Sequence, residues 1–171
     1  MIARRTIVLP LLLLPLLSIE SNAQLRHKPS KAKTLDYLST KAGLGPWDIW
    51  KTQPLRNRLI ALLGSEQFQT LQMNMDPADP LKTSNGVMSS GGNRAHLGGE
   101  EEGVLLLDLN DDVIEVLILN RGGVVRAWAE HNSSVPIPPT IRERLNQWPQ
   151  AALHQALASL NHQADPISNP K

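Results

Sequence analysis

Residues 104–130 read VLLLDLNDDVIEVLILNRGGVVRAWAE, and this stretch decides the fold. It contains three apolar runs separated by two short polar segments, 110–112 and 120–123. Short apolar runs bounded by Asn, Asp and Gly are typical of strands joined by hairpin turns. The stretch therefore predicts an antiparallel meander of consecutive strands.

The middle run of this stretch, residues 113–119, is apolar at nearly every position. A strand with one solvated face alternates apolar and polar residues, so we expect both faces of this strand to be covered. Asp108 and Glu115 are carboxylates embedded in the strands, and such a pair can mark an acid and a base of an enzyme. We expect instead that both point to the solvent-facing edge of the sheet. The last strand, which carries Arg126 and Glu130, should be more exposed.

Helices are expected on both sides of the meander. An apolar stripe over residues 54–63 predicts a helix that Gly64 closes, and a second stripe over 150–160 predicts a helix near the C-terminus. Asn85-Gly86 is a hairpin signal that adds a strand before the meander. Because helices and strands are segregated along the chain, the fold class is α+β, an antiparallel meander sheet with helices packed on it from both the N- and C-terminal segments.

The N-terminus has the features of a signal peptide. Arg4 and Arg5 precede an apolar run that two prolines interrupt, and residues 21–23 are small at the positions that a signal peptidase reads. We expect cleavage near Ala23, no stable membrane anchor, and a periplasmic or secreted protein. The predicted organisation is a signal peptide (1–23), a flexible lead-in (24–33), a single α+β domain (34–162) and a frayed tail (163–171).

The charge of the chain excludes some classes of partner. Of 17 basic and 16 acidic residues, the predicted signal peptide holds two and one, which leaves 15 of each in the mature protein. This balance argues against nucleic acid as a partner. The absence of cysteine excludes cysteine nucleophiles, thiolate zinc sites and iron–sulfur clusters.

Residues 89–103, SSGGNRAHLGGEEEG, hold one histidine, His96, among glycines. A phosphate-binding loop is excluded, because this stretch leads into a strand and not into the N-terminus of a helix. A metal site is not expected, since no second histidine stands at a chelating spacing. The glutamates at 100–102 are interpreted as a solvated entry to a buried strand. No nucleophile elbow is present, so we predict neither an enzyme nor a cofactor.

The stretch VMSSGGNRAHLGGEEEGVLLLDL resembles the family of inhibitors of vertebrate lysozyme. That family has a Val-Met-Ser-like strand, a loop of pattern Cys-x-x-His-x-Cys-Gly and a further strand; here Val87 begins the first strand and His96 stands at the histidine position. Asn93 and Gly98 stand where the family has its two cysteines, so no disulfide can brace this loop. The resemblance implies a small exported α+β protein whose loop enters the cleft of a c-type lysozyme, where the histidine meets the catalytic carboxylates.

The resemblance and the loop composition together predict a non-enzymatic binding protein. The expected partner-binding residues are all in or beside the loop: Asn93, Arg94, Ala95, His96 and Leu97. An alternative is a structural or assembly module of the envelope, in which the loop is only a connection and the tryptophans or the C-terminal helix bind a partner or a second copy as a homodimer.

Overall fold

The computed structural model describes residues 33–162. Within them the chain forms η1 (Asp36–Lys41), α1 (Pro46–Ile49), α2 (Leu55–Met73), β1 (Lys82–Ser84), β2 (Val87–Asn93), β3 (Glu102–Asp108), β4 (Val113–Asn120), β5 (Val124–Ala129), η2 (Glu130–Asn132), α3 (Pro139–Leu145) and α4 (Gln150–His162). The predicted signal peptide, the lead-in up to residue 32 and the predicted tail lie outside the described residues.

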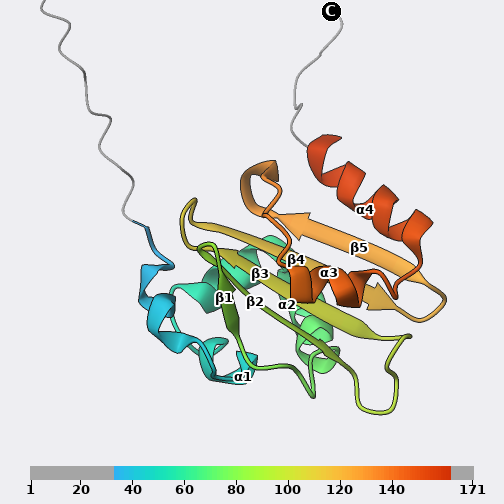
Figure 1. Cartoon of the computed structure of the whole chain (residues 1–171), viewed down its shortest axis with the longest axis horizontal. Coiled ribbons are helices and arrows are strands. Elements are labelled where there is room, and N and C mark those ends of the chain that lie inside the picture. The colour runs from blue at the N-terminus through green and yellow to red at the C-terminus, as the bar shows by residue number, and fades with distance from the viewer. Residues whose placement is uncertain (1–32, 163–171) are drawn as a thin grey trace, which may run out of the picture. The chain divides into compact units, whose positions relative to one another are not determined.

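The strands form one antiparallel sheet in the order β1-β2-β3-β4-β5, so each strand pairs with the next one along the chain (Figure 1). The predicted α+β fold with an antiparallel meander is confirmed. The predicted turn between β1 and β2 is confirmed too: Asn85 and Gly86 have φ values of 51° and 81°. Two consecutive positive φ values are what a type I′ hairpin turn requires.

Helices cover both faces of the sheet (Figure 1). Side chains of η1, α1 and α2 pack on one face, and side chains of α3 and α4 pack on the other. The first core includes Leu38, Ile49, Leu59, Leu71, Met88, Leu105, Leu107, Ile114, Val116 and Ile118. The second includes Val87, Val104, Leu106, Leu117, Leu119, Ile141, Leu145, Trp148 and Leu153. The sheet is thus the middle of three layers.

Burial along the strands follows from these layers. All of β3 and all of β4 except its last residue are buried, whereas β5 is largely half-buried or exposed. The expected covering of both faces of the middle strand is confirmed, and so is the greater exposure of the last strand. Gly64, with φ 74° and ψ 164°, interrupts α2 where the sequence predicts a helix end.

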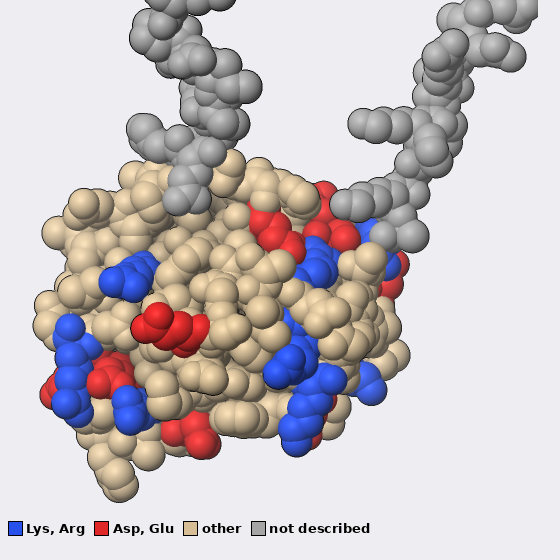
Figure 2. All heavy atoms as spheres, turned by 180° about the vertical axis from the view of Figure 1, so that it is seen from behind, with Lys and Arg blue, Asp and Glu red and all other residues tan. Residues whose placement is uncertain are grey.

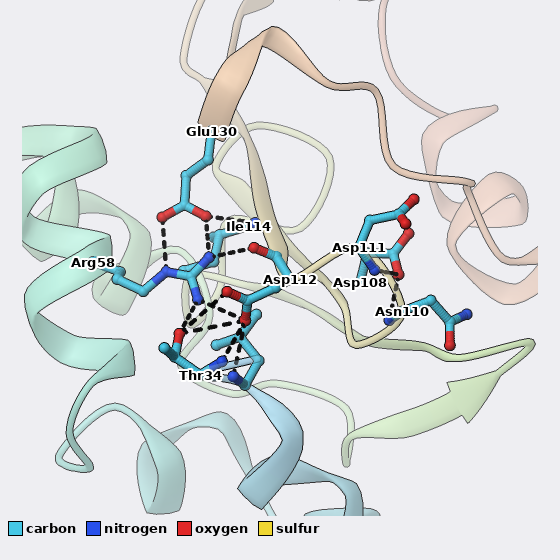
Figure 3. A network of polar contacts seen from close by, with 9 residues as sticks. Thr34, Arg58, Asp108, Asn110, Asp111, Asp112, Ile114 and Glu130 are labelled. Carbon is cyan, nitrogen blue, oxygen red and sulfur yellow. Dashed lines mark hydrogen bonds and ion pairs between the residues drawn. The ribbon is translucent and has the colours of Figure 1, made fainter. Parts of the chain in front are cut away.

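The expected position of the two strand carboxylates is wrong. Asp108 is only 5% exposed and Glu115 is fully buried. Asp108 accepts the N–H groups of Asn110 (2.8 Å) and Asp111 (3.0 Å), and thereby closes the turn between β3 and β4 (Figure 3). Glu115 accepts the N–H of Val135 at 2.7 Å through Oε2. Because helices cover both faces, the central strands offer these side chains no solvent-facing side.

Arg58 joins α2 to the end of the sheet at which the β3–β4 turn lies and β5 ends (Figure 3). Its guanidinium donates to Oε1 of Glu130 at 2.9 Å and to Oδ1 of Asp112 at 3.0 Å, and also contacts Oε2 of Glu130. Asp112 further accepts the backbone N–H groups of Thr34 and Leu35, both at 2.9 Å. Burial raises the pKa of the Asp112 carboxyl, but these bonds outweigh burial and hold the pKa below its ordinary value. The network fixes the N-terminal segment against the β3–β4 turn.

The surface carries no large field of one sign on the face that Figure 2 shows. Acidic and basic side chains of the described residues are interspersed there between wide uncharged areas. Among residues 33–162, no helix is both long and apolar enough to cross a bilayer.

Candidate functional site

The loop between β2 and β3 is the predicted contact loop, and it is shorter than the sequence suggested. β2 continues through its two glycines to Asn93, which pairs with Glu102, so the connection is only residues 94–101. It projects beyond the end of the sheet at which the β4–β5 turn also lies (Figure 1). The loop is therefore a hairpin tip on a paired base.

Gly91 and Gly92 serve close packing rather than flexibility. A Cβ on Gly91 would lie 2.6 Å from Nε of Arg144, and a Cβ on Gly92 would lie 2.6 Å from the carbonyl oxygen of Pro77 and 2.9 Å from Cα of Ala78. Real Cβ atoms do not approach other atoms so closely. Because these positions are glycine, the segment after α2 and the side chain of Arg144 can lie against β2. This explains why a glycine pair stands inside a strand.

His96 lies in the loop with an exposed side chain and a φ of 63°. The left-handed region costs a non-glycine residue about 1–2 kcal/mol. The imidazole makes no hydrogen bond or ion pair with any residue in the described part of the chain. Arg94 and Ala95 are also exposed, and Leu97 is half-buried. A strained residue with an unused polar side chain is the kind of feature that marks binding sites.

The loop backbone is ordered by its own hydrogen bonds. The N–H of Arg94 donates to the carbonyl of Glu101 at 2.9 Å, which extends the β2–β3 ladder by one step. The N–H groups of Leu97 and Glu101 donate to the carbonyls of Arg94 and Leu97, both at 2.9 Å. The N–H of Ala95 donates at 3.0 Å to the carbonyl of Asp76, beyond the end of α2. The loop is thus tied both to itself and to the segment beside β2.

Ion pairs add a second set of ties. Glu101, whose side chain is 12% exposed, binds Nη1 of Arg94 through Oε2 at 2.8 Å and Nε of Arg121 through Oε1 at 2.9 Å. Arg121 lies in the β4–β5 turn and also comes within 3.7 Å of Glu100. One carboxylate therefore connects the start of the loop, the end of the loop and the neighbouring turn.

Glu102, at the base of the loop, is buried, so its interpretation as a solvated glutamate is wrong. It is 5% exposed. Its Oε2 accepts the indole N–H of Trp148 at 2.9 Å and Nη1 of Arg144 at 3.1 Å, while its Oε1 accepts the backbone N–H of Gly99 at 2.7 Å. Strand alternation places Glu102 on the face of the second core, where α3 and Trp148 supply its donors.

Positions 93 and 98 are adjacent in space. A Cβ on Gly98 would lie 3.6 Å from Nδ2 and 3.8 Å from Cγ of Asn93, at ordinary contact distance. The Asn93 amide donates to the carbonyl of Arg94 at 3.0 Å. In the resemblance described above, these two positions correspond to the two cysteines of the loop pattern. Their proximity in the structure agrees with that resemblance.

The five predicted contact residues all lie on this loop or at its base, but the sequence did not indicate the residues that hold it. Those residues are Glu101, Glu102, Arg121, Arg144 and Trp148. The burial of Glu102 follows from strand alternation, because it shares a face with Val104 and Leu106. Glu101 lies within the loop itself. Arg121, Arg144 and Trp148 come from distant segments, and no local pattern indicates them.

Other parts of the described chain have fewer features of a binding or catalytic site than this loop. A groove of about 540 Å³ lies between β5 and α4, lined by residues such as Val124, Trp128 and Gln155. Neither of the two strand carboxylates lines it. Within residues 33–162 no three acidic or histidine side chains gather to hold a metal ion. Trp50, Trp148 and the α4 residues Leu153 and Leu160 are buried, so these parts of the assembly-module alternative are used within the fold. Trp47 is 41% exposed, and Trp128 and Ala152 line the groove.

Comparison with known proteins gives one result. No curated protein and no solved structure matches the chain. A family model described as inhibitor of vertebrate lysozyme (Ivy) matches residues 54–151, which is 98 of the 171 residues. The match runs from the start of α2 to the start of α4 and includes the loop, its base and every residue that braces it. The chain belongs to the inhibitor of vertebrate lysozyme family.

Proposed function

We propose that the protein is an exported, non-enzymatic inhibitor of c-type lysozymes, and that loop 94–101 enters the cleft of the target with His96 at the contact point. The observation that carries this proposal is the free imidazole of His96, exposed on an ordered hairpin tip. Family membership supplies the class of target.

The chemistry of the target suits this side chain. A retaining glycosidase uses two carboxyl groups that flank the scissile bond, one as an acid and one as a nucleophile. An imidazole has two ring nitrogens and can donate or accept hydrogen bonds according to its protonation state. Placed between the two carboxyl groups, His96 would occupy the sugar position and block proton transfer to the leaving group.

The neighbours of His96 have supporting roles. Arg94 keeps donors available, because its side chain is 45% exposed while Nη1 binds Glu101. Ala95 is small and exposed, so the backbone of the tip can approach a target wall closely. Leu97 is half-buried and its backbone takes part in the turns of the loop. Asn93 ends β2 and fixes the start of the loop through its amide.

Export is part of the same proposal. Residues 1–23 have the composition of a signal peptide, and a lysozyme inhibitor acts where cell-wall polymer is exposed. N-terminal sequencing of the protein recovered from the periplasm or medium should begin at Gln24.

Cell-wall lysis by a c-type lysozyme tests the function. Purified residues 24–171 should inhibit lysis, and His96→Ala should weaken inhibition by about 30-fold, the loss expected when an interface hot spot worth about 2 kcal/mol is truncated. His131→Ala is the matched control, because His131 is also exposed and also has a positive φ (57°), but lies after β5 at the opposite end of the sheet. No inhibition at micromolar excess, or equal effects of the two substitutions, would contradict the proposal.

A further inference from the structure

The loop of this protein has no covalent bridge, yet its conformation is defined by contacts at several points. The chain contains no cysteine, and Asn93 and Gly98 face one another across the loop. An inhibitor loop has to be ordered before binding, because ordering it during binding reduces affinity. Something other than a disulfide must supply that order here.

The side chain of Glu101 is at the centre of these contacts. Its two oxygens bind two different guanidinium groups, from Arg94 and Arg121, at 2.8 and 2.9 Å. Glu101 is 12% exposed, whereas the two arginines are 45% and 63% exposed. The carboxylate is therefore fixed, and two solvated cations close over it from the loop and from the β4–β5 turn.

Glu102 holds the second half of the loop independently of Glu101. Its Oε1 accepts the N–H of Gly99, and its Oε2 is held by Trp148 and Arg144. The contact with Trp148 is buried and the other two are part-buried, so salt affects them less than the exposed ion pairs of Glu101. A change at Glu101 thus leaves the base of the loop anchored.

We propose that the Glu101–Arg94–Arg121 cluster replaces the missing bridge as the brace of the loop, so that loop order and target affinity depend on ionic strength and not on redox conditions. This inference rests on the proposed function for its target and deepens it by naming how the same site is regulated. Glu101 and Arg121 act as positioning residues, because neither needs to contact the lysozyme.

The expected size of the effect is modest. Attraction between partly exposed charges is screened as the Debye length falls from about 10 Å at 0.1 M salt to about 3 Å at 1 M. Exposed pairs are each worth a factor of about 1.5 to 5 in an equilibrium constant. Two pairs on one carboxylate should change affinity by roughly 2- to 25-fold when both are lost.

Four proteins test the proposal: the unchanged chain, Glu101→Gln, Asn93→Cys with Gly98→Cys, and the triple variant. Gly98 does not have a positive φ, so a cysteine fits there, and its Cβ would meet only the side chain at position 93. Binding to a c-type lysozyme is measured at 0.05 and 0.5 M NaCl, with the cysteine variants oxidised and then reduced with dithiothreitol. The unbound proteins are compared by hydrogen exchange at the Arg94 and Glu101 amides.

We expect Glu101→Gln to weaken binding about 2- to 25-fold at low salt and to speed exchange at both amides. The oxidised triple variant should bind as tightly as the oxidised double-cysteine variant, and reduction should weaken the triple variant more than the double-cysteine variant. Salt also screens attraction between the two proteins, but this effect is common to the unchanged chain and the double-cysteine variant, because they carry the same charge. The brace is therefore measured by the difference in salt dependence between the unchanged chain and the oxidised double-cysteine variant.

Equal salt dependence of binding in the unchanged chain and the oxidised double-cysteine variant would contradict the proposed brace. So would a disulfide that fails to restore binding in the Glu101→Gln background. If the unchanged chain does not bind lysozyme at all, the proposed function fails. The exchange measurement on the unbound protein still decides the brace by itself, because unaltered exchange in Glu101→Gln would show that the cluster does not order the loop.

Discussion

Trp148 donates its indole N–H to Oε2 of Glu102 over 2.9 Å, and Glu102 binds Gly99 of the loop through its other oxygen. One buried carboxylate therefore connects the segment between α3 and α4 with the candidate contact loop. A defect in the second core should consequently disturb the loop, although the loop itself is on the surface.

Replacing Glu102 by Ala should lower the free energy of unfolding by about 3 kcal/mol, because the indole N–H and the Arg144 guanidinium lose a buried acceptor. Urea denaturation measures this loss. Glu101→Ala is the control: its partners are largely exposed, so it should cost less than about 1 kcal/mol. Similar losses of unfolding free energy for both variants would contradict the conclusion that Glu102 contributes more to stability than Glu101.

Glu115 should make stability depend on pH. Burial raises its pKa from 4.5 to about 7, although the bond from the Val135 N–H opposes the shift. Between these values the unfolded chain loses a proton that the folded chain keeps, so the free energy of unfolding falls as pH rises from 4.5 to 7, by about 3 kcal/mol in all. Below pH 4.5 this contribution is fully present.

Glu115→Gln removes the titrating group and keeps an acceptor for Val135. Denaturation curves from pH 4 to 8.5 should show a flatter profile for the variant, which becomes the more stable protein above pH 7. Profiles that stay parallel across this range would contradict the raised pKa.

Arg58→Gln should destabilise the fold by about 2 kcal/mol, because it leaves the half-buried carboxylates of Glu130 and Asp112 without their cation. Thermal or urea unfolding measures the loss. Arg126→Gln provides a comparison at an exposed arginine of β5 that has no ion pair among the described residues, and it should change stability by less than about 0.5 kcal/mol. If Arg58→Gln lowered stability no more than Arg126→Gln, the Arg58 network would contribute little to the stability of the fold.

Gly92→Ala should cost about 1–3 kcal/mol, because the new methyl group overlaps the backbone of Pro77 and Ala78 and forces it to move. Gly98→Ala adds the same group where it meets only Asn93 at ordinary distance, so it should have little effect. The pair of variants separates a packing requirement from general glycine flexibility. Equal stability of the two proteins would argue that β2 can shift freely.

The sequence predicts the sheet well because its turns are local signals. Asn85-Gly86 and the polar segment 110–112 mark where strands end, and the apolar runs between them need no distant information. The candidate loop could be found for the same reason, since His96 stands out among its neighbours.

Most of the errors share one cause, and Asp108, which is held by its own turn, is the exception. Gly91 and Gly92 look like loop residues until the backbone after α2 and the side chain of Arg144 are seen against them. Glu102 and Glu115 look solvated because they are charged, yet α3 and the segment around Val135 reach them from far along the chain. Contacts between distant segments override local preference at these positions.

The division of the apolar residues between the two faces also means that one core is complete earlier along the chain than the other. Every fully buried member of the core beneath α2 lies at or before Ile118, whereas the other core needs residues as late as Leu153. As the chain emerges from its N-terminus, the first core can close once β4 is present. The opposite face of the sheet stays uncovered until α3 and α4 follow, and it is the surface from which a newly made chain would aggregate or recruit a chaperone.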